Sequence, residues 1–127
     1  DFNILNLYQK RYNMDSERVN TFEAYTEIWA NILNSFILSN NEYKNFVKYI
    51  NLEKEWCKIQ SYKIFYLTNL GENNTIDINK YTNVLAYFII RCEIYNNFKE
   101  FIKLFGKKIC CNRTIYFKFL NHTSKIY

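Results

Sequence analysis

Apolar residues recur at spacings of three and four along most of this chain, which is the pattern of amphipathic α-helices. Little interrupts the pattern, because the 127 residues contain no proline and only two glycines, Gly71 and Gly106. The polar breaks are asparagine pairs instead, at Asn40-Asn41, Asn73-Asn74 and Asn96-Asn97. We therefore expect an all-α fold, a single-domain helical bundle of six or seven helices that occupies residues 1–127.

The first half of the sequence contains several periodic segments. Residues 4–12 predict a short amphipathic helix, and the apolar stripe of residues 19–36 predicts a longer one. In residues 43–67 the apolar residues continue, but their phase slips near Asn51 before the stripe resumes. The slip indicates either two helices or a kink in this part of the chain.

The clearest segment covers about residues 77–95. Its apolar residues step by three and four while further apolar residues fill the flanking faces, so this helix is apolar nearly all round. A helix of this kind is normally buried, and we expect it to be the central helix of the bundle. Residues 98–105 predict a short amphipathic helix closed by Gly106, and the alternation in residues 114–120 fits either a strand or a last short helix.

Composition limits the classes of partner. The chain is 49% apolar, which is enough for one sizeable core. Its net charge is +5, from 17 basic and 12 acidic residues, but the basic residues are scattered rather than clustered, so we do not expect nucleic-acid binding. No run of about 18 apolar residues is present, and we expect no membrane span.

Residue types that support catalysis are sparse. The only histidine, His122, lies in the polar C-terminal tail, where a surface position is expected. Neither a glycine-rich phosphate loop nor an acidic cluster suited to calcium or magnesium occurs. We therefore expect no enzyme activity, no cofactor and no metal, and an interaction module in which a groove between aromatic-rich helices takes a partner's amphipathic helix.

Four cysteines and three N-glycosylation sequons leave the cellular compartment open. The cysteines are Cys57, Cys92, Cys110 and Cys111, and the sequons begin at Asn73, Asn112 and Asn121. The cysteine spacing fits neither a zinc site nor a redox motif. In a secreted protein, Cys57 or Cys92 would pair with one of the two vicinal cysteines; in a cytosolic protein all four would be reduced, and the first two would act as small core residues.

One segment carries a family resemblance. Residues 80–88, with the sequence Lys-Tyr-Thr-Asn-Val-Leu-Ala-Tyr-Phe, are similar position by position to the BH1 motif that opens the central helix of Bcl-2 proteins, typically Asn-Trp-Gly-Arg-Val-Val-Ala-Phe-Phe. Apolar positions correspond, whereas Lys80, Thr82 and Asn83 depart from the motif, and Asn83 takes the slot of the arginine that pairs with the ligand's aspartate in cellular members. The order of predicted helices agrees with that fold.

The resemblance implies a viral Bcl-2-like protein that binds the BH3 helix of a pro-apoptotic host protein, or an adaptor in innate signalling. The implied location is the host cytoplasm or mitochondrial surface. The implied groove residues come from the second and the central helix, and they are Phe22, Tyr25, Trp29, Tyr81, Val84, Leu85 and Phe88. Replacing Val84 or Leu85 with a charged residue is then expected to abolish binding.

An alternative of a different class remains open. The same residues suit a secreted helical effector or cytokine-like ligand of a host receptor, with disulfides that involve the four cysteines and with glycans on some of the three sequons. The oxidation state of the cysteines separates the two hypotheses.

Overall fold

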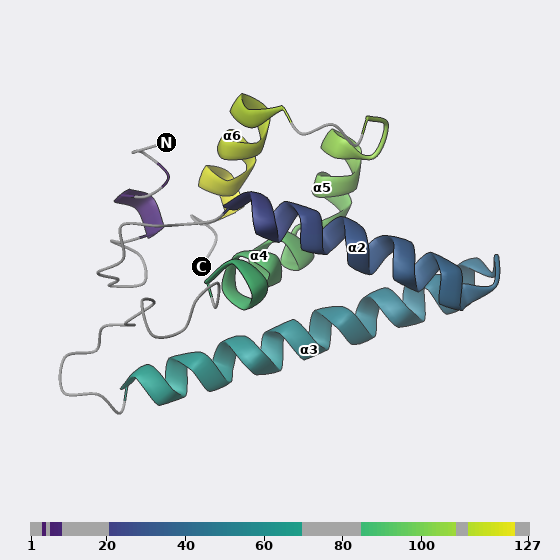
Figure 1. Ribbon diagram of the computed structural model, residues 1–127, viewed down its shortest axis with the longest axis horizontal. Coiled ribbons are helices and arrows are strands. Elements are labelled where there is room, and N and C mark those ends of the chain that lie inside the picture. Colours follow the sequence, from purple (N-terminus) through teal and green to yellow (C-terminus); the bar gives the residue numbers. More distant parts are fainter. Residues whose placement is uncertain (1–3, 5, 9–20, 70–84, 109–111, 124–127) are drawn as a thin grey trace.

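The computed structural model describes residues 4, 6–8, 21–69, 85–108 and 112–123 (Figure 1). Every regular element in these ranges is a helix, as residues 4 and 6–8 also are. The elements in chain order are α2 (Thr21–Ser39), α3 (Tyr43–Asn69), the π-helical segment η1 (Leu85–Ile90), α4 (Arg91–Asn96), α5 (Phe98–Phe105) and α6 (Arg113–Thr123). The predicted all-α bundle is confirmed. No helix in the described ranges combines the length and the apolar character that crossing a membrane requires.

Helices α2 and α3 form an antiparallel hairpin that turns at Asn40 and Asn41. Both asparagines have positive φ angles, 52° and 66°, and asparagine adopts this left-handed conformation more readily than other residues with a side chain. The predicted break at this pair is therefore confirmed. In Figure 1 the two helices meet near the turn and separate toward their other ends.

Helix α3 is one continuous helix of 27 residues, so the interpretation of residues 43–67 as two helices is wrong. The apolar phase slips because α3 carries apolar residues on two opposite faces. Ile50 and Cys57 are buried against the bundle, whereas Leu52 and Trp56 lie on the outward face and are more than half exposed. In the sequence, an apolar stripe that moves to the other face of one helix therefore gives the same pattern as the start of a new helix.

The segment formed by η1 and α4 lies between α2 and α3 and contacts both. All seven residues from Ile89 to Tyr95 are buried, including the charged Arg91 and Glu93. The Ser61 hydroxyl of α3 donates a hydrogen bond of 3.0 Å to the carbonyl oxygen of Phe88. This part of the predicted central helix is confirmed, and residues 77–84 lie outside the described ranges.

A cluster of aromatic rings joins α5 and α6 to the first half of α2. The Tyr25 ring packs edge to face against Phe101, Phe105 and Tyr116, with centroid separations of 5.3 to 5.7 Å. The Tyr116 hydroxyl also donates a hydrogen bond of 2.6 Å to the carbonyl oxygen of Thr21. These contacts place the short C-terminal helices over one side of α2.

The ambiguous segment at residues 114–120 is helical, as part of α6. Tyr116, Phe119, Leu120 and Thr123 are its buried residues, and their spacing of three and one follows a helix rather than a strand. The side chain of Asn112 caps the helix, because its Oδ1 accepts a hydrogen bond of 3.1 Å from the backbone N–H of Ile115.

Candidate functional site

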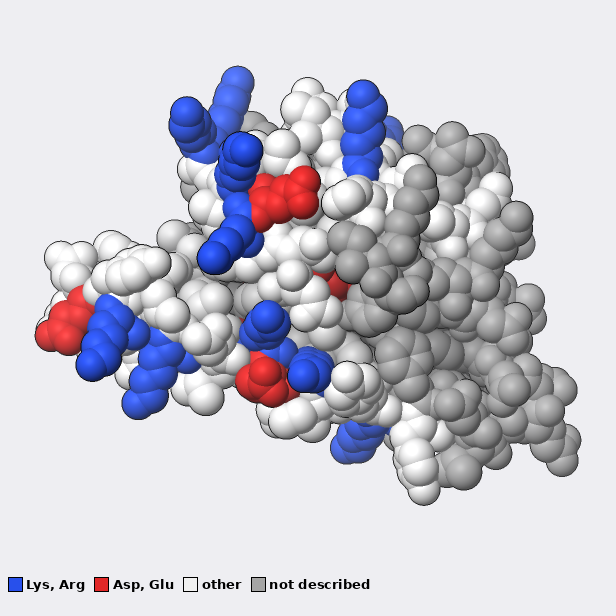
Figure 2. Space-filling model, turned by 180° about the vertical axis from the view of Figure 1, so that it is seen from behind, with Lys and Arg blue, Asp and Glu red and all other residues white. Residues whose placement is uncertain are grey.

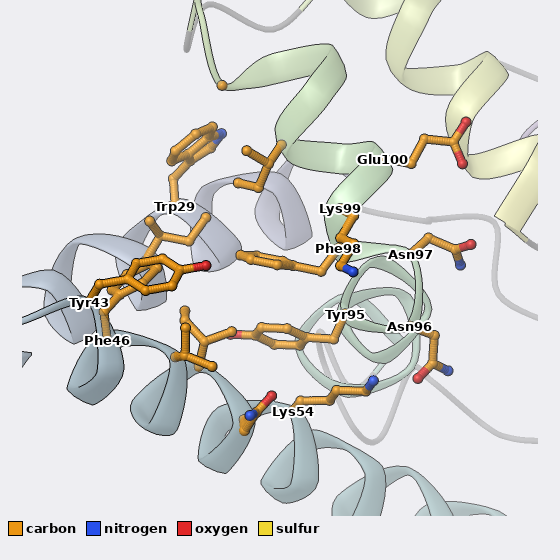
Figure 3. A pocket seen from close by; sticks show the side chains of 16 residues that line it. Trp29, Tyr43, Phe46, Lys54, Tyr95, Asn96, Asn97, Phe98, Lys99 and Glu100 are labelled. Carbon is orange, nitrogen blue, oxygen red and sulfur yellow. The ribbon is translucent and has the colours of Figure 1, made fainter.

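A groove of about 940 Å³ lies where α2, α3, α4 and α5 meet (Figure 3). Its size is at the upper end of the range of about 300–1,000 Å³ that is usual for ligand pockets. Four elements and the short connection after α4 supply its lining residues, which are Trp29, Ile32, Tyr43, Phe46, Val47, Ile50, Asn51, Lys54, Tyr95, Asn96, Asn97, Phe98, Lys99, Glu100, Ile102 and Gly106. The lining is mainly aliphatic and aromatic, so the groove suits an apolar ligand surface.

Two stacked rings form the inner wall of the groove. Tyr95 of α4 and Phe98 of α5 lie nearly parallel, with an angle of 25° between their planes and 6.0 Å between their centroids. Figure 3 shows both rings pointing from their helices toward α3. Tyr95 is almost fully buried and Phe98 is half-buried, so Phe98 offers the more accessible ring surface.

A hydrogen-bonded network behind this wall holds Tyr95 in place. The Tyr95 hydroxyl donates to Asn31 Oδ1 at 2.7 Å, and the Arg91 guanidinium donates to the same oxygen at 3.1 Å. Arg91 is also 3.5 Å from a carboxylate oxygen of Glu27 and lies 5.9 Å from the centroid of the Phe88 ring. The hydrogen bond to Asn31 fixes the orientation of the Tyr95 ring on the inner wall. Arg91 Nε is buried without a hydrogen-bond partner among the described residues.

Cys57 and Tyr95, beside or within this network, are shielded from solvent. Burial raises the pKa of the Cys57 thiol to about 11, although the neighbouring Arg91 guanidinium acts in the opposite direction. Burial likewise raises the pKa of the Tyr95 phenol well above its ordinary value. Both groups are therefore neutral at physiological pH, and Tyr95 remains a hydrogen-bond donor.

The rim of the groove contains charged residues and one buried donor. Figure 3 shows Lys54 of α3 and Lys99 of α5 beside the aromatic rings. The indole N–H of Trp29 is buried and has no hydrogen-bond partner in the structure. Glu100 contributes a carboxylate that lies 3.9 Å from His122 Nε2 of α6. The basic groups would complement acidic residues on a bound ligand.

Apolar side chains continue from the groove along the α2–α3 hairpin. Leu33 and Phe36 lie one and two turns beyond Trp29 on the same face of α2, and each is 55% exposed. On α3, Tyr43 and Val47 are also exposed. Tyr43 and Val47 line the groove, and Leu33 and Phe36 add exposed apolar surface on α2 toward the hairpin turn.

The structure places four of the seven predicted groove residues, and their surroundings differ. Trp29 lines the groove, Tyr25 belongs to the buried aromatic cluster, and Phe22 packs against the rings of Tyr116 and Phe117 of α6. Phe88 is half-buried beneath Arg91.

The other three predicted groove residues, Tyr81, Val84 and Leu85, are not described to the same extent. Leu85 begins η1, but its side chain is not among those described. Tyr81 and Val84 lie outside the described ranges.

The groove-lining residues that were not predicted from the sequence include Ile32 of α2, Tyr95 of α4 and the walls on α3 and α5. Phe46, Val47 and Ile50 supply the wall on α3, and Phe98 and Ile102 supply the wall on α5. The signal for them was the amphipathic periodicity of residues 43–50 and 98–105, which identifies an apolar face. Periodicity does not tell whether that face packs fully against the core or remains partly open.

The structure describes two of the four cysteines. Cys57 and Cys92 are both buried, on α3 and α4 respectively. Cys110 and Cys111 lie outside the described ranges. The described pair therefore occupies core positions, which is the arrangement expected for the reduced form of the chain.

The remaining sequence candidates lie on the surface. Asn112 and Asn121 are exposed, and Asn73 lies outside the described ranges. The side chain of His122 is 58% exposed on α6. Among the described residues, no group of three or more histidine, cysteine or acidic side chains is placed to hold a metal ion.

The fold and the groove define this protein as a helical bundle with an apolar groove between its helices. No protein-family model matches the sequence, and no curated protein or solved structure matches it.

Proposed function

We propose that this chain is a non-enzymatic protein–protein interaction module whose groove binds an amphipathic helix of a partner. The observation that carries the proposal is the open apolar lining between α3 and α5. Val47, Phe98 and Ile102 all face the groove, and none of the three is fully buried. Apolar surface that remains exposed in a groove of this kind is typical of binding sites.

The shape of the apolar surface favours a helix over a compact ligand. Trp29, Leu33 and Phe36 follow one face of α2 for about two turns, and Tyr43 and Val47 follow α3 alongside. A helix that binds in a groove contributes apolar anchors at positions i, i+3 or i+4, and i+7, and these need an elongated track. The groove, together with Leu33 and Phe36 on α2, provides such a track.

The basic residues beside the groove favour a partner with acidic residues. Lys54 and Lys99 border the groove on α3 and α5, and the net charge of the chain is +5. Acidic residues on the edges of a partner helix would meet these lysines, and the long-range attraction would increase the association rate. Figure 2 shows other basic side chains spread over one face among acidic ones, without a continuous basic patch.

A more specific proposal is that the chain acts as a viral Bcl-2-like inhibitor of apoptosis or innate signalling in the host cytosol or at the mitochondrial surface. The similarity of residues 80–88 to the BH1 motif supports it. The buried segment from Ile89 to Tyr95 and the close succession of α4 and α5 agree with the arrangement expected for that fold. The partner would then be a BH3-type helix of a host protein.

The test is a fluorescence titration with a BH3-type peptide. In the variant Trp56→Phe, Trp29 is the only tryptophan, so its emission reports on the groove. We expect the emission to change on binding. Val47→Glu, which puts a charge into the groove, should weaken binding at least about tenfold. Leu104→Glu is the matched control, because Leu104 is similarly exposed but does not line the groove.

The outcomes separate the two levels of the proposal. Binding of another amphipathic helical peptide, but of no BH3-type peptide, would retain the interaction module and reject the Bcl-2-like assignment. Equal affinities for the Val47→Glu and Leu104→Glu variants would show that the groove is not the binding site. Circular dichroism of each variant verifies that its helical content is unchanged.

A further inference from the structure

The outward face of α3 carries a second apolar stripe that is separate from the groove. Its members are large apolar side chains that are 54% to 66% exposed, and they are Leu52, Trp56, Ile59, Tyr62 and Tyr66. Their spacing keeps them on one side of the helix, opposite the buried Ile50, Cys57 and Ser61. Figure 1 shows α3 at one edge of the molecule, with the other helices on its inner side.

The outward stripe is symmetric about Ile59 in the sequence. Trp56 precedes Ile59 by three residues and Tyr62 follows it by three. Leu52 precedes it by seven residues and Tyr66 follows it by seven. In an antiparallel pair of α3 helices centred on Ile59, each aromatic or aliphatic residue is therefore level with another apolar residue of the second copy.

One pair of exposed charged residues on this side of α3 has the same symmetry with opposite signs. Glu55 precedes Ile59 by four residues and Lys63 follows it by four, and both are exposed. In the antiparallel pair, Glu55 of each copy is level with Lys63 of the other. The two-fold axis repeats this pairing, so the interface contains two complementary contacts. In a parallel pair, Glu55 would instead face Glu55.

The apolar area that the outward stripe can bury is consistent with a dimer of weak to moderate affinity. A large aromatic side chain exposes about 150–250 Å², so the three rings of the stripe, at 54% to 66% exposure, have on the order of 300–450 Å² per copy left to bury. Leu52 and Ile59 add to this area. A stable interface needs roughly 600 Å² or more per copy, which places the stripe near the lower limit.

We propose that the outward stripe of α3 is the interface of a two-fold symmetric homodimer, in which two α3 helices pack antiparallel about Ile59. A second copy of this chain fits the stripe because it supplies both the apolar residues and the opposite charges at the matching heights. The dimer leaves the groove free, because the groove opens on another face of α3. The expected dissociation constant is micromolar.

The test is sedimentation of the full chain between about 1 μM and about 1 mM. The wild-type chain should shift from monomer to dimer over this range. Ile59→Glu should weaken association at least about a hundredfold, because it buries two like charges at the axis. Leu104→Glu, an exposed change on α5, is the control and should leave association unchanged.

A charge exchange tests the register. Glu55→Lys and Lys63→Glu should each weaken the dimer about tenfold, because each places like charges level with one another. The double variant restores opposite charges and should recover association close to that of the wild type. A chain that stays monomeric at every concentration, a dimer insensitive to Ile59→Glu, or a double variant weaker than both single variants would each overturn the proposal.

Discussion

Asn31 Oδ1 accepts hydrogen bonds from both the Tyr95 hydroxyl, at 2.7 Å, and the Arg91 guanidinium, at 3.1 Å. One amide oxygen of α2 thus holds two side chains of α4, one of which forms the inner wall of the groove. Because both donors are buried, the loss of this acceptor would leave the Tyr95 hydroxyl without this partner and Arg91 with its ion pair to Glu27.

Asn31→Ala is therefore expected to lower the free energy of unfolding by about 2–4 kcal/mol. Asn34→Ala is the matched control on the same helix, because Asn34 is exposed, and it should change stability by less than about 0.5 kcal/mol. Urea unfolding followed by circular dichroism measures both values. Equal stabilities of the two variants would contradict the role given to Asn31.

The Tyr8 hydroxyl donates a hydrogen bond of 3.2 Å to Glu93 Oε2, and Glu93 is fully buried. Tyr8→Phe removes this donor without changing the ring, so it should destabilise the fold by about 1–2 kcal/mol. Tyr43→Phe removes the hydroxyl of an exposed tyrosine outside the outward stripe and serves as the control. Thermal unfolding curves of the two variants should therefore differ, and coincident curves would show that the bond to Glu93 contributes no stability.

The stability of the fold should fall in alkali. The pKa of Cys57 is about 11 in the folded chain and 9.0 ordinarily, so above pH 9 the unfolded chain releases the proton first. Cys57 makes its full contribution to the free energy of unfolding below pH 9. About 2–3 kcal/mol of that free energy is lost as the pH approaches 11. Tyr95 adds to the loss, because burial raises its pKa as well.

Urea unfolding at several pH values between 8 and 11 measures this effect. Cys57→Ala lacks the thiol, so its stability should decline less steeply with pH than that of the wild type, even though the smaller side chain lowers its stability at neutral pH. Parallel pH profiles for the two proteins would contradict the assigned contribution of Cys57.

The two tryptophans should differ in their access to solvent. Trp29 packs between Tyr25 and Phe101 and is half-buried, whereas Trp56 is 54% exposed on α3. Acrylamide should quench the emission of the Trp56→Phe variant, which retains Trp29, less than that of the Trp29→Phe variant. In the Trp29→Phe variant, quenching should also decrease with protein concentration if the outward stripe forms a dimer.

Helix boundaries and buried segments were predictable from the sequence to a greater extent than the exposed surfaces. The break at Asn40 and Asn41 was predictable because these residues tolerate positive φ angles and interrupt a clear apolar period. The burial of the apolar residues between Ile89 and Tyr95 was predictable from their spacing, whereas the burial of the charged Arg91 and Glu93 was not. Both features depend on local residue types.

The continuity of α3 and the walls of the groove were not predictable in the same way. The apolar phase slip near Asn51 has the same appearance whether a helix ends or whether it changes its apolar face. Similarly, Phe46 and Ile102 lie on ordinary amphipathic faces, and only the packing of α2, α3 and α5 determines that these faces remain partly open. Tertiary arrangement, rather than local preference, decides such features.

The anchoring of Tyr95 has a consequence for binding affinity. A wall that is held by Asn31 and Arg91 does not need to be ordered when a ligand arrives, so the loss of conformational entropy falls mainly on the incoming segment. Partner peptides that already populate a helix in solution should therefore bind more tightly than unstructured peptides with the same anchor residues. Across a set of such peptides, affinity would then increase with helicity, and the groove would contribute the same free energy of binding to each of them.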